Sequence, residues 1–162
     1  MIKGRVWKFG DNINTDVIIP GEFLASPIDV AKTHVLEAVN PRFAKEVGGG
    51  DILVAGKNFG CGSSRESAPQ ALKSLGLGAV VAESFARIFF RNAIAIGLPV
   101  LSCANVWKSF NDGDEIELDV EKAEVINPKS GLSLQGTSLP KPMLEVLNKG
   151  GIKAVLKEMF GK

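Results

Sequence analysis

The sequence predicts an α/β protein with a partly parallel sheet flanked by helices and an antiparallel meander towards the C-terminus. Two successive strand–helix–strand passages within residues 51–101 favour parallel strands joined by right-handed crossovers. After residue 112, charged and apolar residues alternate, as they do in antiparallel strands with one exposed face. The 162 residues, 45% hydrophobic and 23% charged, suit one globular domain spanning residues 1–162.

The N-terminal segment predicts two strands. Residues 4–9 alternate in polarity, and residues 17–19 form a short β-branched run that a proline and a glycine end. Polar residues 14–16 (Asn-Thr-Asp) stand at the mouth of that second strand. A turn or an Asx cap explains them as well as a functional role does.

Residues 29–50 predict two short helices. The first, residues 29–39, is amphipathic, and Asn40 would be the N-cap of the second. Glycines 48–50 end that helix and suggest a hinge or a loose loop. His34 titrates near neutrality, but a histidine in a polar helix is more often incidental than catalytic.

The centre of the chain alternates strands and helices. Buried strands are expected at residues 51–56, 77–82 and 98–101, with a helix at 67–76 between the first two. A second helix, residues 85–96, would be capped by Ser84 and closed by a glycine.

The second central helix carries apolar residues at helical spacing, so packing in the core explains them: Phe85, Ile88, Phe89 and Ile96. Arg87 and Arg91 share another face of that helix, which we expect to face solvent or a subunit.

The C-terminal part predicts strands at 115–120, 124–126 and 132–134, which suggest a barrel or sandwich component beside the parallel strands. Short helices at 142–147 and 152–160 follow.

Composition excludes several functions. A net charge of +1 gives no reason to expect a nucleic acid or membrane partner, and no segment has the pattern of a signal peptide or membrane span. We therefore expect a cytoplasmic protein. Cys61 and Cys103 could pair, but with His34 they cannot supply a closed iron–sulfur or zinc site. Any metal that the reaction needs must come from elsewhere.

The most informative stretch is Asn58-Phe59-Gly60-Cys61-Gly62-Ser63-Ser64-Arg65-Glu66, a glycine-rich turn between a strand and a helix. Ser63 and Glu66 satisfy a capping box, which explains two of its residues. Backbone glycines and an arginine at a helix start additionally favour binding of a carboxylate or phosphate.

The chemistry of this turn is narrowed by what it lacks. It has neither the lysine of a phosphate-binding loop nor the G-x-S-x-G motif of hydrolases, and no motif supports a Cys61–His34 nucleophile. A serine beside Arg65 could act as a base on an acidic C–H bond, provided that a metal or a second subunit polarised the substrate.

These motifs carry a resemblance to a known family. The turn, together with Ser84-Phe85-Ala86-Arg87-Ile88, Gly97-Leu98-Pro99 and the early Asn14-Thr15-Asp16-Val17-Ile18-Ile19-Pro20, resembles the swivelling β/β/α domain of the aconitase superfamily. The early segment is similar to the free-standing form of that domain, the small subunits of 3-isopropylmalate dehydratases. The resemblance spans roughly residues 4–101.

The resemblance implies a shared active site. A separate large subunit would hold a [4Fe-4S] cluster whose open iron binds the substrate, while this chain binds no cofactor. Ser63 would be the base that removes the carbon-bound proton, Ser64 would help to hold the substrate, and Arg65 would bind a carboxylate. The reaction would isomerise 2-isopropylmalate to 3-isopropylmalate in leucine biosynthesis.

In this family a tetrad after residues 14–19 bears on substrate choice, here Phe23, Leu24, Ala25 and Ser26. Homoaconitase-like members place an arginine there to meet an extra carboxylate, whereas Ala25 and Ser26 leave room for an isopropyl group. The nearest candidate for a second substrate-binding cation is Lys32.

Two other hypotheses remain open. One is the small subunit of a homoaconitase or of a hydro-lyase for a methyl-substituted malate. The other is a non-catalytic module that binds a dicarboxylate. Exposed apolar surface for a large partner would also favour self-association of the isolated chain.

Overall fold

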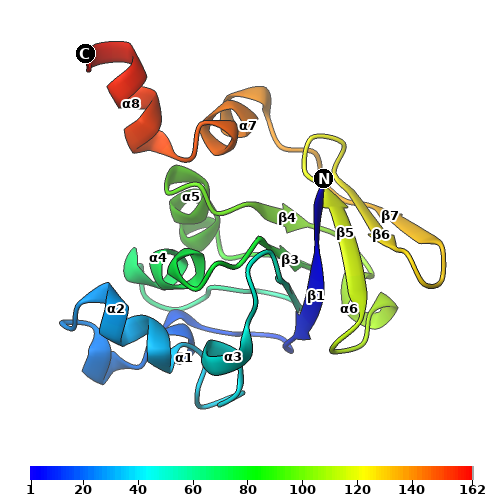
Figure 1. Cartoon of the computed structure of the whole chain (residues 1–162), viewed down its shortest axis with the longest axis horizontal. Coiled ribbons are helices and arrows are strands. Elements are labelled where there is room, and N and C mark those ends of the chain that lie inside the picture. The colour runs from blue at the N-terminus through cyan, green and yellow to red at the C-terminus, as the bar shows by residue number, and fades with distance from the viewer. Residues whose placement is uncertain (162) are drawn as a thin grey trace.

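A seven-stranded sheet forms the centre of the fold in the computed structural model, which describes residues 1–161 (Figure 1). Its strand order is β4-β3-β2-β1-β5-β6-β7. The parallel strands are β1 (Ile2–Lys8), β2 (Ile52–Ala55), β3 (Ala79–Ala82) and β4 (Val100–Ser102). The antiparallel strands are β5 (Glu115–Asp119), β6 (Glu124–Asn127) and β7 (Leu132–Gln135). The predicted fold class is confirmed.

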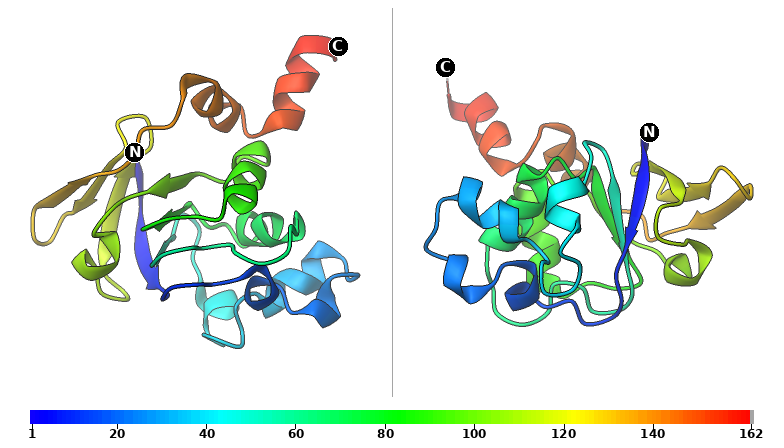
Figure 2. Two further views of the ribbon diagram at one scale, coloured as in Figure 1. Left: turned by 180° about the vertical axis from the view of Figure 1, so that it is seen from behind. Right: turned by 60° about the horizontal axis from the view of Figure 1, so that its bottom comes forward.

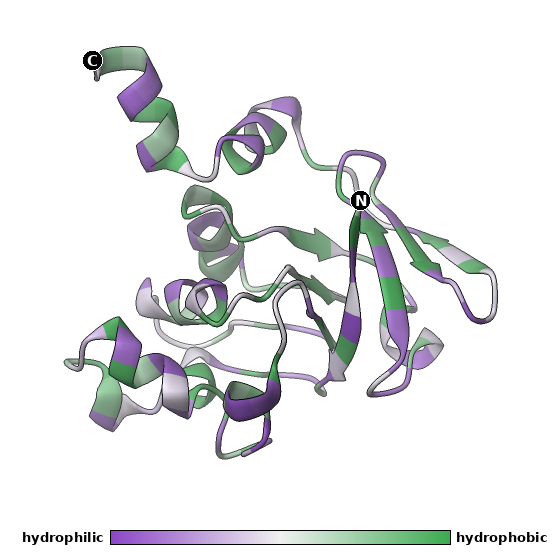
Figure 3. Ribbon diagram, viewed as in Figure 1, coloured by the Kyte–Doolittle hydropathy of each residue, from purple (hydrophilic) through white to green (hydrophobic). Residues whose placement is uncertain are grey.

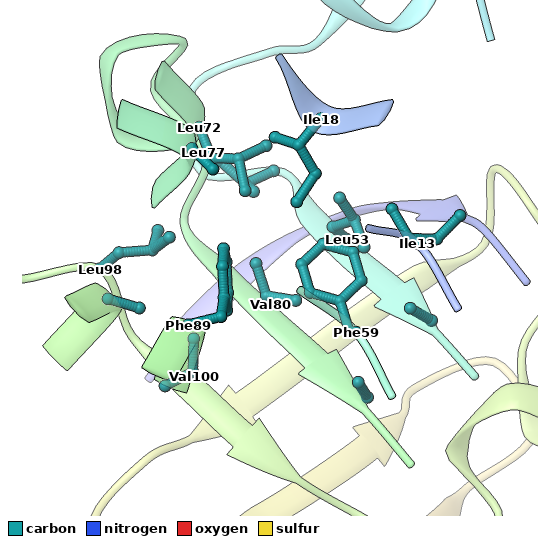
Figure 4. Packing of buried hydrophobic residues seen from close by; sticks show 14 of the residues in the cluster. Ile13, Ile18, Leu53, Phe59, Leu72, Leu77, Val80, Phe89, Leu98 and Val100 are labelled. Carbon is teal, nitrogen blue, oxygen red and sulfur yellow. The ribbon is translucent and has the colours of Figure 1, made fainter. Parts of the chain in front are cut away.

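The sheet separates two hydrophobic cores. Helices α4 (Ser67–Ser74) and α5 (Arg87–Ala95) cover one face, where Leu53, Val80 and Phe89 belong to one core (Figure 4). On the other face, Val54 and Val81 belong to a second core with Ile116 of β5. The meander therefore continues the parallel sheet through the β1–β5 pairing and helps to bury it.

The predicted strand at residues 17–19 is wrong. Residues Thr15–Ile18 form a helical turn, α1, and Asn14 Oδ1 accepts a hydrogen bond from the N–H of Val17 at 2.9 Å. This confirms an Asx cap at Asn14. In so short a run the cap outweighs β-propensity. Ile18 at the end of the turn and Ile19, which follows it in an extended conformation, are both fully buried.

The helices between residues 20 and 50 are shorter than predicted. They are η1 (Gly21–Phe23), α2 (Ile28–Ala31), η2 (Lys32–His34) and α3 (Phe43–Glu46). The first predicted helix ends by His34, since Leu36 takes a left-handed conformation with φ of +57°. Asn40 is not the N-cap of α3, although its Oδ1 accepts from the N–H of Arg42.

The glycines at 48–50 are not a loose loop. Gly50 donates its N–H to Gly76 at 2.9 Å, and the carboxylate of Asp51 accepts from Gly48. The same carboxylate accepts from the indole of Trp7 at 2.9 Å. These hydrogen bonds fasten the segment to the start of β2.

Helix α5 begins at Arg87, two residues later than predicted, and Ser84 does not cap it. The hydroxyl of Ser84 instead accepts from the N–H of Asn58 at 2.8 Å. The core assignment is right for Phe89, which is 2% exposed, but wrong for Ile88, which is 51% exposed.

The C-terminal strands and the two last helices agree with the predictions, but the expected barrel or sandwich component is wrong, because β5, β6 and β7 extend the same open sheet as the parallel strands. Alternating polarity is visible along β5 (Figure 3), and a short helix, α6 (Val106–Ser109), precedes that strand. Helices α7 (Lys141–Asn148) and α8 (Ile152–Phe160) follow the meander, and α8 points away from the sheet (Figure 2). None of the helices within residues 1–161 is both long and apolar enough to cross a membrane.

Candidate active site

The glycine-rich turn leaves the end of β2 and runs past the start of α5. Gly60 and Gly62 have φ of +82° and +95°, a region that favours glycine. A Cβ atom on Gly60 would lie 2.3 Å from the ring of Phe89, so only glycine lets the turn pack this closely on α5. The glycines therefore serve both the backbone path and the close approach.

The predicted capping box is wrong. Glu66, rather than Ser63, stands at the N-cap position of α4, and no side chain caps this helix. Ser63, Ser64 and Arg65 consequently lie in the turn before the helix and not on its first turn. Tertiary contacts of Ser63 take the place of the local cap.

Arg65 is the centre of a small polar cluster. Its Nε donates to Ser63 Oγ at 3.0 Å, and its Nη2 lies 2.8 Å from Asp16 Oδ1. Its Nη1 donates to the carbonyl of Ile19 at 3.4 Å. The side chain is only 21% exposed, so these contacts fix the orientation of the guanidinium.

Helical turn α1 supplies the other half of the cluster. Thr15 Oγ1 donates to the carbonyl of Ser63 at 2.8 Å, and the N–H of Thr15 donates to the carbonyl of Cys61 at 2.9 Å. Ser63 Oγ lies 3.4 Å from Asp16 Oδ1. Sequence reasoning did not single out Thr15 or Asp16 as site residues. The signal that could have found them was the polar run at residues 14–16.

A cavity of about 360 Å³ opens beside this cluster. The turn contributes Ser63, Ser64 and Arg65 to its lining, and the start of α5 contributes Arg87 and Ile88. A cation hydrogen-bonded to Ser63 Oγ stabilises negative charge on that oxygen. The arrangement can therefore support proton transfer at Ser63 and binding of an anionic group in the cavity.

The remaining predicted site residues lie elsewhere. The ring of Phe23 stacks on His34 with 3.7 Å between centroids, and His34 Nδ1 lies 2.8 Å from Glu37 Oε2. Lys32 Nζ lies 3.7 Å from Asp29 Oδ1. Neither Lys32 nor the tetrad at residues 23–26 is part of the lining of the cavity beside Ser63.

The donor set of the residues that the structure describes does not fit a metal centre. Cys61 and Cys103 are both free thiols, and Cys103 is 1% exposed. Among residues 1–161, no three His, Cys, Asp or Glu side chains gather closely enough to hold a metal ion.

Comparison with known proteins identifies the family. The 3-isopropylmalate dehydratase small subunit 1 of Archaeoglobus fulgidus is 54% identical over 96% of this chain and 97% of that protein. The chain belongs to the 3-isopropylmalate dehydratase small-subunit family. The model of the aconitase C-terminal domain matches residues 26–105, in agreement with the resemblance seen in the sequence.

Relatives in this family carry several substrate names. An isopropylmalate/citramalate isomerase small subunit from Methanocaldococcus jannaschii is 49% identical over all of this chain and 97% of that protein. A methanogen homoaconitase small subunit from Methanothermobacter thermautotrophicus is 50% identical over 94% of this chain and 88% of that protein. The fold matches the crystal structure of a 3-isopropylmalate dehydratase from M. jannaschii with a TM-score of 0.91. The match has 41% sequence identity and covers 98% of this chain and 94% of that chain.

Proposed function

We propose that this chain is the small subunit of a cytoplasmic hydro-lyase that converts 2-isopropylmalate into 3-isopropylmalate by dehydration and rehydration, in leucine biosynthesis. The observation that carries the proposal is 54% identity, over almost the whole chain, with a 3-isopropylmalate dehydratase small subunit. The Ser63–Arg65 hydrogen bond supports it, because the reaction needs a base for an acidic C–H bond.

Ser63 Oγ is the atom that we assign to proton transfer. It removes the carbon-bound proton in the dehydration and returns a proton when water adds to the alkene. The Nε of Arg65 stabilises the negative oxygen of Ser63 before it takes the proton and again after it has returned the proton. Nη1 of Arg65 donates one hydrogen bond to the carbonyl of Ile19, and Nη2 forms the ion pair with Asp16. Each of these nitrogens carries two hydrogens, so one on each can serve a substrate carboxylate. Ser64, exposed beside them, helps to hold the substrate.

The proposal includes a large-subunit partner that carries the [4Fe-4S] cluster. The donor set of residues 1–161 does not suit such a cluster. Residues 1–162 then act as one swivelling domain that brings Ser63, Ser64 and Arg65 to the substrate on the large subunit.

The tetrad at residues 23–26 does not line the cavity of this chain, and we expect it to favour isopropylmalate over homoaconitate once the large subunit completes the site. Ala25 and Ser26 offer no cation to an additional carboxylate. The homoaconitase small subunit among the relatives makes homoaconitate the second candidate. We expect turnover of isopropylmalate to exceed that of homoaconitate, and the reverse preference would assign the chain to the homoaconitases.

The experiment that tests the function is reconstitution with a cluster-bearing large subunit of this family. We expect isomerisation of 2-isopropylmalate, measured by chromatography of substrate and product, from the mixture only. Turnover by this chain alone would contradict the proposal. Calorimetric binding of a dicarboxylate to this chain, with no turnover on adding any large subunit, would favour a non-catalytic binding module.

A further inference from the structure

The two arginines of the cavity beside Ser63 differ in how their charges are balanced. Arg65 forms an ion pair with Asp16 at 2.8 Å, so the pair contributes no net charge to the cavity. Arg87 also lines the cavity and is exposed. None of the ion pairs within residues 1–161 involves Arg87. The unbalanced positive charge of the lining therefore belongs to Arg87.

The backbone holds Arg87 at a fixed place relative to the turn. Phe59 donates its N–H to the carbonyl of Ser84 at 3.1 Å, and Ala86 donates to the carbonyl of Phe59 at 2.9 Å. The ring of Phe89 packs directly on Gly60. Arg87 follows Ala86 in the chain, so the contacts that place the turn also place this arginine.

A dicarboxylate substrate brings two negative charges into the site, and each requires compensation when water is excluded. The Arg65–Asp16 pair can donate hydrogen bonds to one carboxylate but supplies little net attraction. We propose that Arg87 is a second substrate-binding cation, which holds the carboxylate that Arg65 does not hold. This inference rests on the proposed function and adds a residue to its site. Lys32, the candidate from the sequence, pairs with Asp29 and lies outside the cavity lining.

The test uses the reconstituted two-subunit enzyme with Arg87→Gln, which removes the charge but keeps a polar side chain of similar length. We expect KM for isopropylmalate to rise about 10- to 100-fold, because a charge-assisted hydrogen-bonded pair is lost, while kcat changes less than KM. Arg87→Lys should restore part of the affinity, since it keeps the charge but not the planar fork.

The matched control is Arg91→Gln. Arg91 is an exposed arginine one turn further along α5, which borders a neighbouring hollow together with Arg87 but does not line the cavity of Ser63. Its replacement should leave KM unchanged.

Three results would overturn the inference. They are an unchanged KM for Arg87→Gln, an equal rise for Arg91→Gln, and loss of large-subunit association by Arg87→Gln in sedimentation, which would make Arg87 a subunit contact. If instead the wild-type mixture fails to isomerise isopropylmalate, the proposed function fails. An active wild type with an insensitive Arg87→Gln defeats only the inference about Arg87.

Discussion

The two halves of the sheet differ in burial and in what their loops can build. Every residue of β2 and β3 is buried, whereas buried and partly exposed residues alternate along β5 and β6. Parallel strands end at the same edge, so the segments that follow β1, β2 and β3 meet there. Bridges join Asn14 to Cys61 and Phe59 to Phe85.

The meander has no comparable gathering of loops. Its strands run antiparallel, so successive turns lie at opposite edges and bond locally. In the β6–β7 turn, for example, Asn127 Oδ1 accepts from the N–H groups of Lys129 and Ser130. None of the residues assigned to the candidate site comes from β5, β6 or β7. Paired substitutions in the two halves can therefore test whether function is confined to the parallel half.

The largest effect is expected from Ser63→Ala in the reconstituted enzyme. Loss of the base should lower kcat by about 100- to 10,000-fold while association with the large subunit persists. Ser133→Ala is the control in the meander, where the exposed hydroxyl of Ser133 donates only to Glu124 at 3.0 Å. Steady-state kinetics of both variants measure the difference in kcat. Substantial activity of Ser63→Ala would show that Ser63 is not the base.

Gly60→Ala should lower the free energy of unfolding by about 2 to 5 kcal/mol, because a left-handed residue gains a Cβ that clashes with Phe89. Gly131→Ala in the β6–β7 turn has a similar φ of +77° and open space around the added Cβ. Gly131→Ala should lower the free energy of unfolding by only about 1 to 2 kcal/mol. Denaturant unfolding compares the two, and equal losses would show that the contact with Phe89 is unimportant.

Asp16→Asn should lower kcat about tenfold, because Arg65 loses the ion pair that orients it towards Ser63. Asp119→Asn is the matched change in the meander, where the carboxylate accepts from the N–H of Lys122. Its kcat should equal that of the wild type. An unaffected Asp16→Asn enzyme would show that the other contacts of Arg65 suffice to position it.

The smallest effect concerns thiol reactivity. Burial, with the nearby charge of Glu83, raises the pKa of Cys103 to about 11. At pH 8 only about 0.1% of this thiol is ionised, so alkylation followed by mass spectrometry should label the partly exposed Cys61 first.

Because the folded state holds the Cys103 proton more tightly, the contribution of Cys103 to stability is present below pH 9 and falls as the pH rises towards 11. Equal labelling of both thiols in the folded protein would show that the Cys103 thiol is neither shielded nor raised in pKa.

The secondary structure of the strongly patterned segments was predictable because residues close in sequence determine it. The buried strands β2 and β3, the alternating meander and the two C-terminal helices all agree with their patterns. The prediction failed where a tertiary contact competes with a local signal. Ser63 bonds to Arg65 and Thr15 instead of capping α4, and Ile88 has helical spacing but is half exposed at the cavity.

By itself the sequence determined the fold class, the glycine-rich turn and the identity of Ser63, Ser64 and Arg65 as the residues to test. Only the tertiary structure decided that Asp16 belongs with them and that Arg87 lines their cavity. The physical reason is distance along the chain. Hydrophobic periodicity and turn chemistry act over a few residues, whereas Asp16, Arg65 and Arg87 are brought together by the register of parallel strands.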